Sequence, residues 1–203
     1  MGIRINSLTE YQQAYQKSVE QPEQFWAGVA ENFTWHKKWD TVLEWSFNPY
    51  KTEWFKGAQL NITENCIDRH LPHKANDVAF IWEPNKDGDA AKTITYQQLH
   101  DEVCKVANTL KKLGAKKGDR ICIYLPMIPE AVYAMLACAR IGAVHSVVFA
   151  GFSASSLAGR IQDCDCNIVI TSDGSFRGDK TINLKNVVDE ALLTCPSVKN
   201  VLV

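Results

Sequence analysis

The sequence predicts an α/β fold: a mostly parallel sheet with flanking helices, preceded by a helical, aromatic-rich N-terminal segment. Two observations carry this prediction. Beyond Pro72, short apolar runs alternate with amphipathic helical stretches through short links, which is typical of parallel strands joined by helices. Before Pro72 the helical pattern dominates, and five of the six tryptophans lie there. Each crossover between parallel strands is expected to be right-handed.

The first 75 residues contain several helix signals. Ser7 and Glu10 form a capping box that predicts a helix to about Val19. Pro22 suits the first turn of a second helix, residues 22–31. Residues 33–47 are aromatic, and we expect them to be irregular. Asn61 and Glu64 form another capping box, which opens a short helix to about Leu71.

The remaining residues supply the sheet. Strands are expected at 78–82, 93–96, 121–125, 145–149, 168–171 and 198–203. The first two form a hairpin, and the later four are joined by helices. Helices are expected from Thr95 to Gly114 and at 129–141, 153–163 and 185–193. We therefore divide the chain into residues 1–75, which are expected to wrap the sheet domain, and residues 76–203, which form the sheet domain.

Composition excludes several classes of protein. The net charge of −1 gives no field that would recruit nucleic acid or an anionic membrane. No apolar run reaches the roughly 20 residues that span a bilayer, and no signal peptide is visible. Seven scattered cysteines predict neither a disulfide framework nor a metal site, which fits a cytoplasmic protein. Cys164 and Cys166 form the only close pair, without further ligands.

Two turns after buried strands are candidate binding sites. Residues 170–180 follow a strand and contain Gly174, Gly178, Arg177 and Lys180. Ligands of open α/β sheets bind at the carboxyl ends of strands, and Arg177 offers donors that suit a phosphate. This predicts an anion site; the alternative is a solvated polar loop. Residues 149–152 follow the preceding strand and combine aromatic rings with a glycine. From these residues alone an ordinary strand-to-helix turn is favoured, and the family resemblance given below implies that the ring and the glycine contact a flat purine.

Four sequence runs resemble one family. Residues 54–71 begin Trp-Phe-Lys-Gly-Ala-Gln-Leu-Asn, and residues 33–40, 125–130 and 149–161 add further likeness. Together they resemble the AMP-forming acetyl-CoA synthetases, although Ala58 replaces a usual glycine. The resemblance covers essentially the whole chain and implies the incomplete N-terminal part of the adenylate-forming synthetase fold.

The resemblance also assigns coenzyme A contacts. It implies that Arg177, Gly178, Asp179 and Lys180 grip coenzyme A near its 3′-phosphate. The family more often has arginine where Lys180 stands, and glycine where Asp179 stands. Phe149 and Gly151 correspond to the turn that lies against the adenine of coenzyme A.

The implied parent protein is an acetate–CoA ligase. It activates acetate with ATP and Mg²⁺ to acetyl-adenylate, and then transfers the acetyl group to coenzyme A. No catalytic or metal-binding residue of that family corresponds to a position in residues 1–203, so this chain alone is expected to be inactive. The alternatives are a propionate–CoA ligase, a coenzyme A or nucleotide-binding module without catalysis, and a purely structural piece.

The run 198–203 is an apolar strand whose family neighbours are missing from the chain. An uncovered strand edge pairs readily with another chain. We therefore expect self-association through the truncated edge of the sheet.

Overall fold

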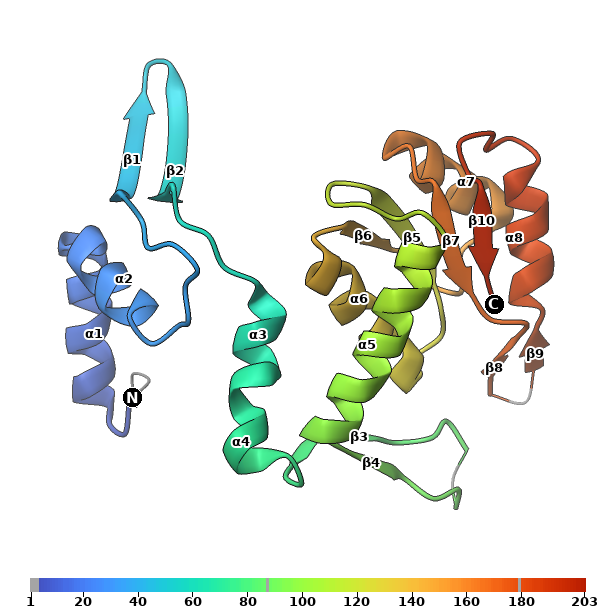
Figure 1. Cartoon of the computed structure of the whole chain (residues 1–203), viewed down its shortest axis with the longest axis horizontal. Helices are drawn as coiled ribbons and strands as arrows, with labels where there is room; N and C mark the ends of the chain where they lie inside the picture. Colours follow the sequence, from blue (N-terminus) through green and yellow to red (C-terminus); the bar gives the residue numbers. More distant parts are fainter. Residues whose placement is uncertain (1–3, 87, 179) are drawn as a thin grey trace. The chain divides into compact units, whose positions relative to one another are not determined.

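The computed structural model describes residues 4–86, 88–178 and 180–203 (Figure 1). The chain divides into two compact units, Met1–Asn61 and Ile62–Val203. Each unit is described by itself below.

The first unit consists of two helices and a hairpin. Helix α1 (Leu8–Glu20) begins at Ser7, whose hydroxyl accepts a hydrogen bond from the Glu10 amide. Helix α2 (Pro22–Ala30) begins at the predicted proline. Strands β1 (Thr41–Phe47) and β2 (Tyr50–Lys56) then pair antiparallel. The expectation that residues 33–47 are irregular was wrong for β1, because aromatic and β-branched side chains favour an extended chain there.

An aromatic cluster holds part of the first unit together. The Trp39 and Phe55 rings lie 5.2 Å apart, and Trp35 lies 5.4 Å from Trp39 and 5.7 Å from Phe55. The Trp35 indole donates a hydrogen bond of 2.8 Å to the Ala30 carbonyl, which ties the cluster to α2. Trp35 and Trp39 thus have partners within their own unit. That the segment wraps the sheet domain stays a prediction.

The second unit is built around a four-stranded parallel sheet in the order β10-β7-β5-β6. Its strands are β5 (Arg120–Tyr124), β6 (Val144–Val147), β7 (Ile168–Thr171) and β10 (Asn200–Leu202). Helices α5 (Tyr96–Lys112), α6 (Pro129–Ile141), α7 (Ala154–Asp163) and α8 (Leu184–Leu192) connect or flank them. The predicted α/β class with a parallel sheet is confirmed.

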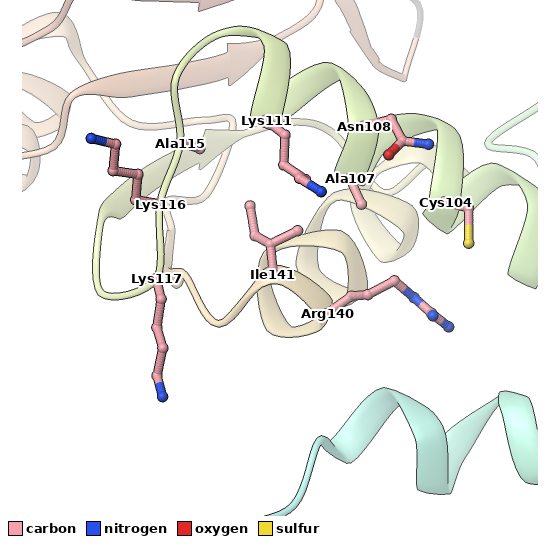
Figure 2. A pocket seen from close by; sticks show the side chains of 9 residues that line it. All are labelled: Cys104, Ala107, Asn108, Lys111, Ala115, Lys116, Lys117, Arg140 and Ile141. Atoms are coloured by element: carbon pink, nitrogen blue, oxygen red, sulfur yellow. The ribbon is translucent and has the colours of Figure 1, made fainter.

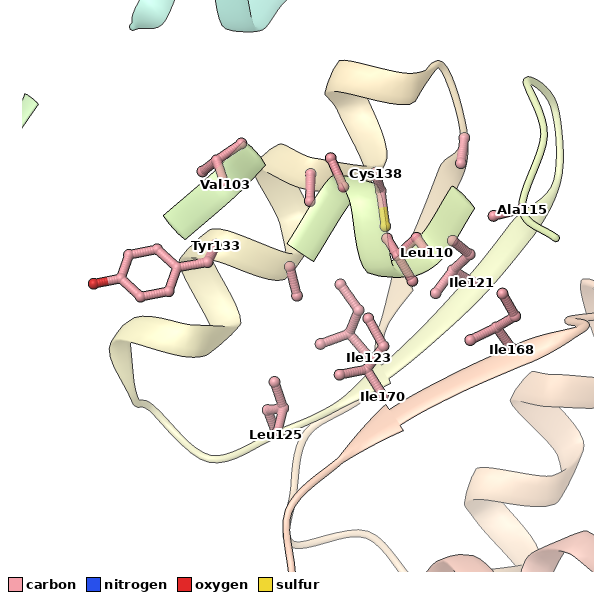
Figure 3. Packing of buried hydrophobic residues seen from close by; sticks show 14 of the residues in the cluster. Val103, Leu110, Ala115, Ile121, Ile123, Leu125, Tyr133, Cys138, Ile168 and Ile170 are labelled. Atoms are coloured by element: carbon pink, nitrogen blue, oxygen red, sulfur yellow. The ribbon is translucent and has the colours of Figure 1, made fainter. Parts of the chain in front are cut away.

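Two hydrophobic clusters cover the two faces of this sheet. On one face Ile121, Ile123, Ile168 and Ile170 pack with residues of α5 and α6 (Figure 3). On the other face the alternate strand residues, among them Val169, pack with α7 and α8. Successive side chains of a strand point to opposite faces, so each buried strand serves both clusters.

Smaller elements complete the second unit. Helix α3 (Ile62–Cys66), the 3₁₀ turn η1 (Asp68–His70) and α4 (Leu71–Lys74) replace the single helix predicted to Leu71. The break falls at Ile67, whose φ of −124° leaves the helical region. Strands β3 (Val78–Trp82) and β4 (Lys92–Thr95) form the predicted hairpin. Strands β8 (Ser175–Arg177) and β9 (Lys180–Ile182) form a second hairpin that the sequence did not predict.

No helix in the described part of the chain has the length and apolar character needed to cross a membrane.

Candidate functional site

The two turns singled out from the sequence lie at the same edge of the sheet. Strands β5, β6 and β7 are parallel, so their carboxyl ends meet at one edge. Phe149 and Gly151 follow β6, while Arg177, Gly178 and Lys180 follow β7, with β5 between the two strands. Asp179 lies outside the described residues. This edge is where open α/β sheets bind ligands.

The hairpin β8–β9 sets two cationic side chains directly opposite each other. Arg177 pairs with Lys180 in the strand register, so both side chains stand on one face of the hairpin. Both are exposed, and neither forms an ion pair with any other described residue. Like charges facing each other across a strand pair repel. An anion bound between Arg177 and Lys180 would offset this repulsion.

The turn between these strands requires a glycine. Gly178 has a φ of +59°, a left-handed conformation that other residues adopt at a cost. Gly178 therefore allows the hairpin to close while Arg177 and Lys180 stay opposite each other.

The base of the hairpin is held by short-range hydrogen bonds. The Gly174 amide donates to the Asp173 carboxylate at 2.8 Å, and the Ser172 hydroxyl donates to the Gly174 carbonyl at 3.0 Å. The Asp173 carbonyl accepts from the Lys185 amide at 3.2 Å, which links the turn to the first residues of α8. A side chain at Gly174 would stand 3.2 Å from the Ile182 carbonyl oxygen, so a small residue suits this close approach.

The turn after β6 presents aromatic rings to solvent. Phe149 is 64% exposed and Phe152 is 43% exposed, and their rings meet edge to face at 5.9 Å. The Phe152 amide donates to the Phe149 carbonyl at 3.0 Å, which closes the turn. The buried Tyr124 hydroxyl donates to the Phe152 carbonyl at 2.7 Å and so fixes the turn to the end of β5.

Gly151 makes room for the Phe149 ring. A Cβ atom at position 151 would lie 2.5 Å from Cε1 of Phe149, closer than any ordinary contact. The glycine therefore leaves the space that the largely exposed Phe149 ring occupies. Exposed aromatic rings are suitable platforms for stacking a base.

Sequence reasoning did not single out Phe176, a further exposed side chain of the hairpin. Its side chain is 70% exposed and stands next to Arg177 on β8. Alternation along the strand directs it to the face of the hairpin opposite Arg177 and Lys180. One sequence signal could have identified Phe176. It is a large apolar residue in an otherwise polar run that lies outside the predicted strands.

The pocket drawn in Figure 2 lies elsewhere. It has a volume of about 520 Å³ and is lined by residues of α5, α6 and the turn before β5. Lys116 and Lys117 lie at one end of it, and Cys104 and Arg140 at the other (Figure 2). Because Lys116 and Lys117 precede β5, this pocket lies at the amino edge of the sheet. None of its lining residues belongs to the two turns.

The groups at the carboxyl edge of the sheet are suited to binding a ligand. It offers cations, exposed rings and backbone groups, while Tyr124 is buried, which raises the pKa of its hydroxyl. The buried thiols Cys122 and Cys138 have pKa values raised to about 12 by desolvation, so they stay protonated. No cluster of three or more histidine, cysteine or carboxylate residues suited to a metal ion occurs in the described ranges.

Comparison with known families divides the chain in two. Residues 11–66 match the family described as the acetyl-coenzyme A synthetase N-terminus. Residues 67–203 match the family described as AMP-binding enzyme. The second match alone covers more than half of the chain.

Individual relatives give the same result. The chain is 55% identical over 195 residues to an acetyl-coenzyme A synthetase of Saccharophagus degradans, covering 96% of this chain and 30% of the relative. It is 52% identical to acetyl-coenzyme A synthetase 2 of Pseudomonas putida, covering 96% and 30%. Among solved structures it resembles an acetoacetyl-CoA synthetase from Streptomyces lividans with a TM-score of 0.84 and 28% identity, covering 92% and 28%. The chain thus spans about 30% of the length of the curated relatives it matches.

Proposed function

The chain belongs to the AMP-binding enzyme family, and we propose that it is the N-terminal part of an AMP-forming acetate–CoA ligase. Such an enzyme joins acetate to ATP, releases pyrophosphate, and then passes the acetyl group to the thiol of coenzyme A. ATP, acetate and coenzyme A are then the small-molecule substrates of the whole protein, and Mg²⁺ accompanies the ATP. The identity of 50–55% to several acetyl-coenzyme A synthetases supports this assignment.

Within this chain, the proposed role is to hold part of coenzyme A. The observation that carries it is the register of β8–β9, which sets Arg177 opposite Lys180 on an exposed surface. The guanidinium of Arg177 is the group best suited to a phosphate, because its fork of donors binds two oxygens at once. Lys180 adds a second positive charge. Gly178 and Asp179 stand between them in the sequence and complete the proposed phosphate-binding run.

The aromatic turn supplies the second half of the proposed surface. Phe149, exposed and kept in place beside Gly151, stacks on the adenine of coenzyme A. The phosphate therefore binds at the hairpin after β7 and the adenine at the turn after β6, on one edge of the sheet.

The domain division is part of the proposal. We assign residues 1–75 to an N-terminal wrapping segment and residues 76–203 to the first part of the large AMP-binding domain. The compact units divide at Asn61–Ile62, and the family matches divide after residue 66, both within the proposed segment.

Three further points complete the proposal. The protein acts in the cytoplasm and uses neither nucleic acid nor a membrane as a partner. It self-associates through the edge of β10, which pairs only with β7 in the described sheet. The choice of acetate over propionate rests on the names of the relatives, since the described residues contain no pocket assigned to the carboxylate.

Calorimetric titration tests the binding role. We expect coenzyme A to bind to the 203-residue chain, and ATP to bind much more weakly. Arg177→Ala should weaken coenzyme A binding by about 10- to 150-fold, because a hydrogen bond to a charged group is worth about 1.5–3 kcal/mol. Arg160→Ala is the matched control, since Arg160 is also exposed but lies in the last turn of α7. Tighter binding of ATP than of coenzyme A would favour a nucleotide-binding module and contradict the assignment.

A further inference from the structure

Two thiols that the proposed function does not use lie almost in contact. The sulfur atoms of Cys164 and Cys166 are 3.1 Å apart, at the turn between α7 and β7. Asp165 between them has a φ of +49°, and this left-handed residue turns the chain so that both side chains meet on one side. No further histidine, cysteine or carboxylate completes a metal site with them in the described residues.

The two thiols differ in accessibility. Cys164 is half-buried, whereas Cys166 is fully buried. Burial raises the pKa of the Cys166 thiol above its ordinary value, so the thiol keeps its proton until it reacts. Cys164 is therefore the sulfur that a reagent from solvent can reach, and Cys166 is the one behind it.

The hydrogen bonds give the two sulfurs separate roles. The Cys164 thiol donates to the Arg160 carbonyl at 2.9 Å, which leaves its sulfur free to accept from Cys166. The Arg120 guanidinium donates to the Cys164 carbonyl at 2.8 Å and to the Asp165 carboxylate at 2.9 Å, and so holds the turn that carries both thiols.

We propose that Cys164 and Cys166 form a redox-active dithiol that exchanges with small-molecule disulfides of the glutathione type. The Cys164 thiolate attacks one sulfur of the disulfide, forms a mixed disulfide and releases one thiolate. The Cys166 thiol then gives up its proton to water as its sulfur attacks the Cys164 sulfur, the bond from Cys164 to the small molecule breaks, and the second thiolate leaves. The protein loses two electrons and two protons, the protons pass through water to the released thiolates, and one disulfide becomes two thiols.

The dithiol is joined to the centre of the sheet. Arg120 is the first residue of β5, the strand between β6 and β7, and it holds the carbonyls of Cys164 and Asp165. Closing a disulfide across Asp165 changes the turn on which these hydrogen bonds depend. The oxidised chain should therefore differ from the reduced chain in the protection of amides at the amino end of β5.

Peptide mapping tests the proposal directly. The folded chain is equilibrated with glutathione disulfide and glutathione at several ratios, quenched in acid, alkylated under denaturing conditions and digested with trypsin. The tryptic peptide 161–177 contains Cys164 and Cys166 as its only cysteines. We expect this peptide to lose the mass of two hydrogens and both alkyl labels as the disulfide fraction rises.

The same digest contains a matched control. Peptide 121–140 also carries two cysteines, Cys122 and Cys138, which are buried in clusters on opposite faces of the sheet. It should keep both alkyl labels under all conditions that oxidise peptide 161–177. Equal oxidation of the two peptides, or persistence of both labels on peptide 161–177 in excess glutathione disulfide, would overturn the proposal.

Single variants separate the two roles. Cys166→Ser should trap a glutathione adduct on Cys164, because the resolving thiol is gone. In Cys164→Ser, peptide 161–177 should carry no adduct, because Cys166 is buried. An adduct on Cys166 in the folded Cys164→Ser chain would contradict the assignment of Cys164 as the attacking group. Circular dichroism before the exchange confirms that each variant is folded, and the wild-type digest remains decisive without them.

Discussion

The Phe149 ring occupies the space where a side chain at position 151 would begin. Adding a single methyl group at this position should therefore affect the position of the ring. Gly151→Ala should displace the Phe149 ring, because the new Cβ would lie 2.5 Å from it. The ring is 64% exposed and can swing outward, so the melting temperature should change little. Coenzyme A affinity, measured by calorimetry, should fall about 5-fold or more, since stacking on a base is worth about 1–3 kcal/mol.

Gly159 provides the control for this change. It lies in α7, and a Cβ there would meet nothing within 4 Å. Gly159→Ala should leave coenzyme A affinity unchanged and stabilise the helix by about 0.5–1 kcal/mol. If Gly151→Ala binds coenzyme A as tightly as Gly159→Ala does, Phe149 does not stack on the ligand.

At the scale of residues, the sequence predicted which side chain could bind an anion, but not which residues lie next to that side chain. A guanidinium after a buried strand predicts an anion site, and the structure has Arg177 exposed at that position. Its pairing with Lys180 depends on the hairpin register, which no composition argument gives. Phe176 was missed because the sequence alone cannot tell an exposed aromatic residue from one that packs beneath a loop.

Among the elements, α5 depends on its first turn. The Thr95 hydroxyl accepts from the Gln98 amide at 3.2 Å, and the Gln98 side chain accepts from the Thr95 amide at 2.9 Å. Thr95→Ala should lower the free energy of unfolding of the second unit by about 1 kcal/mol, measured by urea denaturation. Asn108→Ala, an exposed change within the same helix, should not destabilise it. Equal effects of the two changes would show that the cap contributes nothing.

Elements with a buried face could be predicted, and elements without one could not. Helix α5 buries Leu99, Val103, Ala107 and Leu110 at helical spacing, and Thr95 marks its start. Strand β7 is buried along its whole length and reads as a continuous apolar run. By contrast, β1 and β2 contain no fully buried residue. Their sequences therefore show no clear alternation of apolar and polar residues from which a strand could be predicted. Strands β8 and β9 have three residues each, too few for a period to be visible.

For the whole molecule, the alternation of strands and helices predicted a parallel sheet but not its order. The order β10-β7-β5-β6 arises from pairing between strands that are distant in the sequence, such as β5 with β7. Local patterns contain no information on which strands become neighbours. The order matters for the candidate site, because it sets a single strand between the turns that carry Phe149 and Arg177.

The same order leaves β10 at an edge of the described sheet. Val201 and Leu202 are only half-buried there, and edge strands pair readily with other chains. We expect the average mass from static light scattering to rise with concentration toward a dimer or larger species. A constant monomer mass at high protein concentration would contradict self-association through this edge.

The most direct test of the central claim compares coenzyme A with dephospho-coenzyme A, which lacks the 3′-phosphate, on the wild-type and Arg177→Ala chains. If Arg177 holds that phosphate, the substitution should weaken coenzyme A binding by about 10- to 150-fold and dephospho-coenzyme A binding hardly at all. Equal losses for the two ligands, or no binding of coenzyme A to the wild-type chain, would contradict the claim.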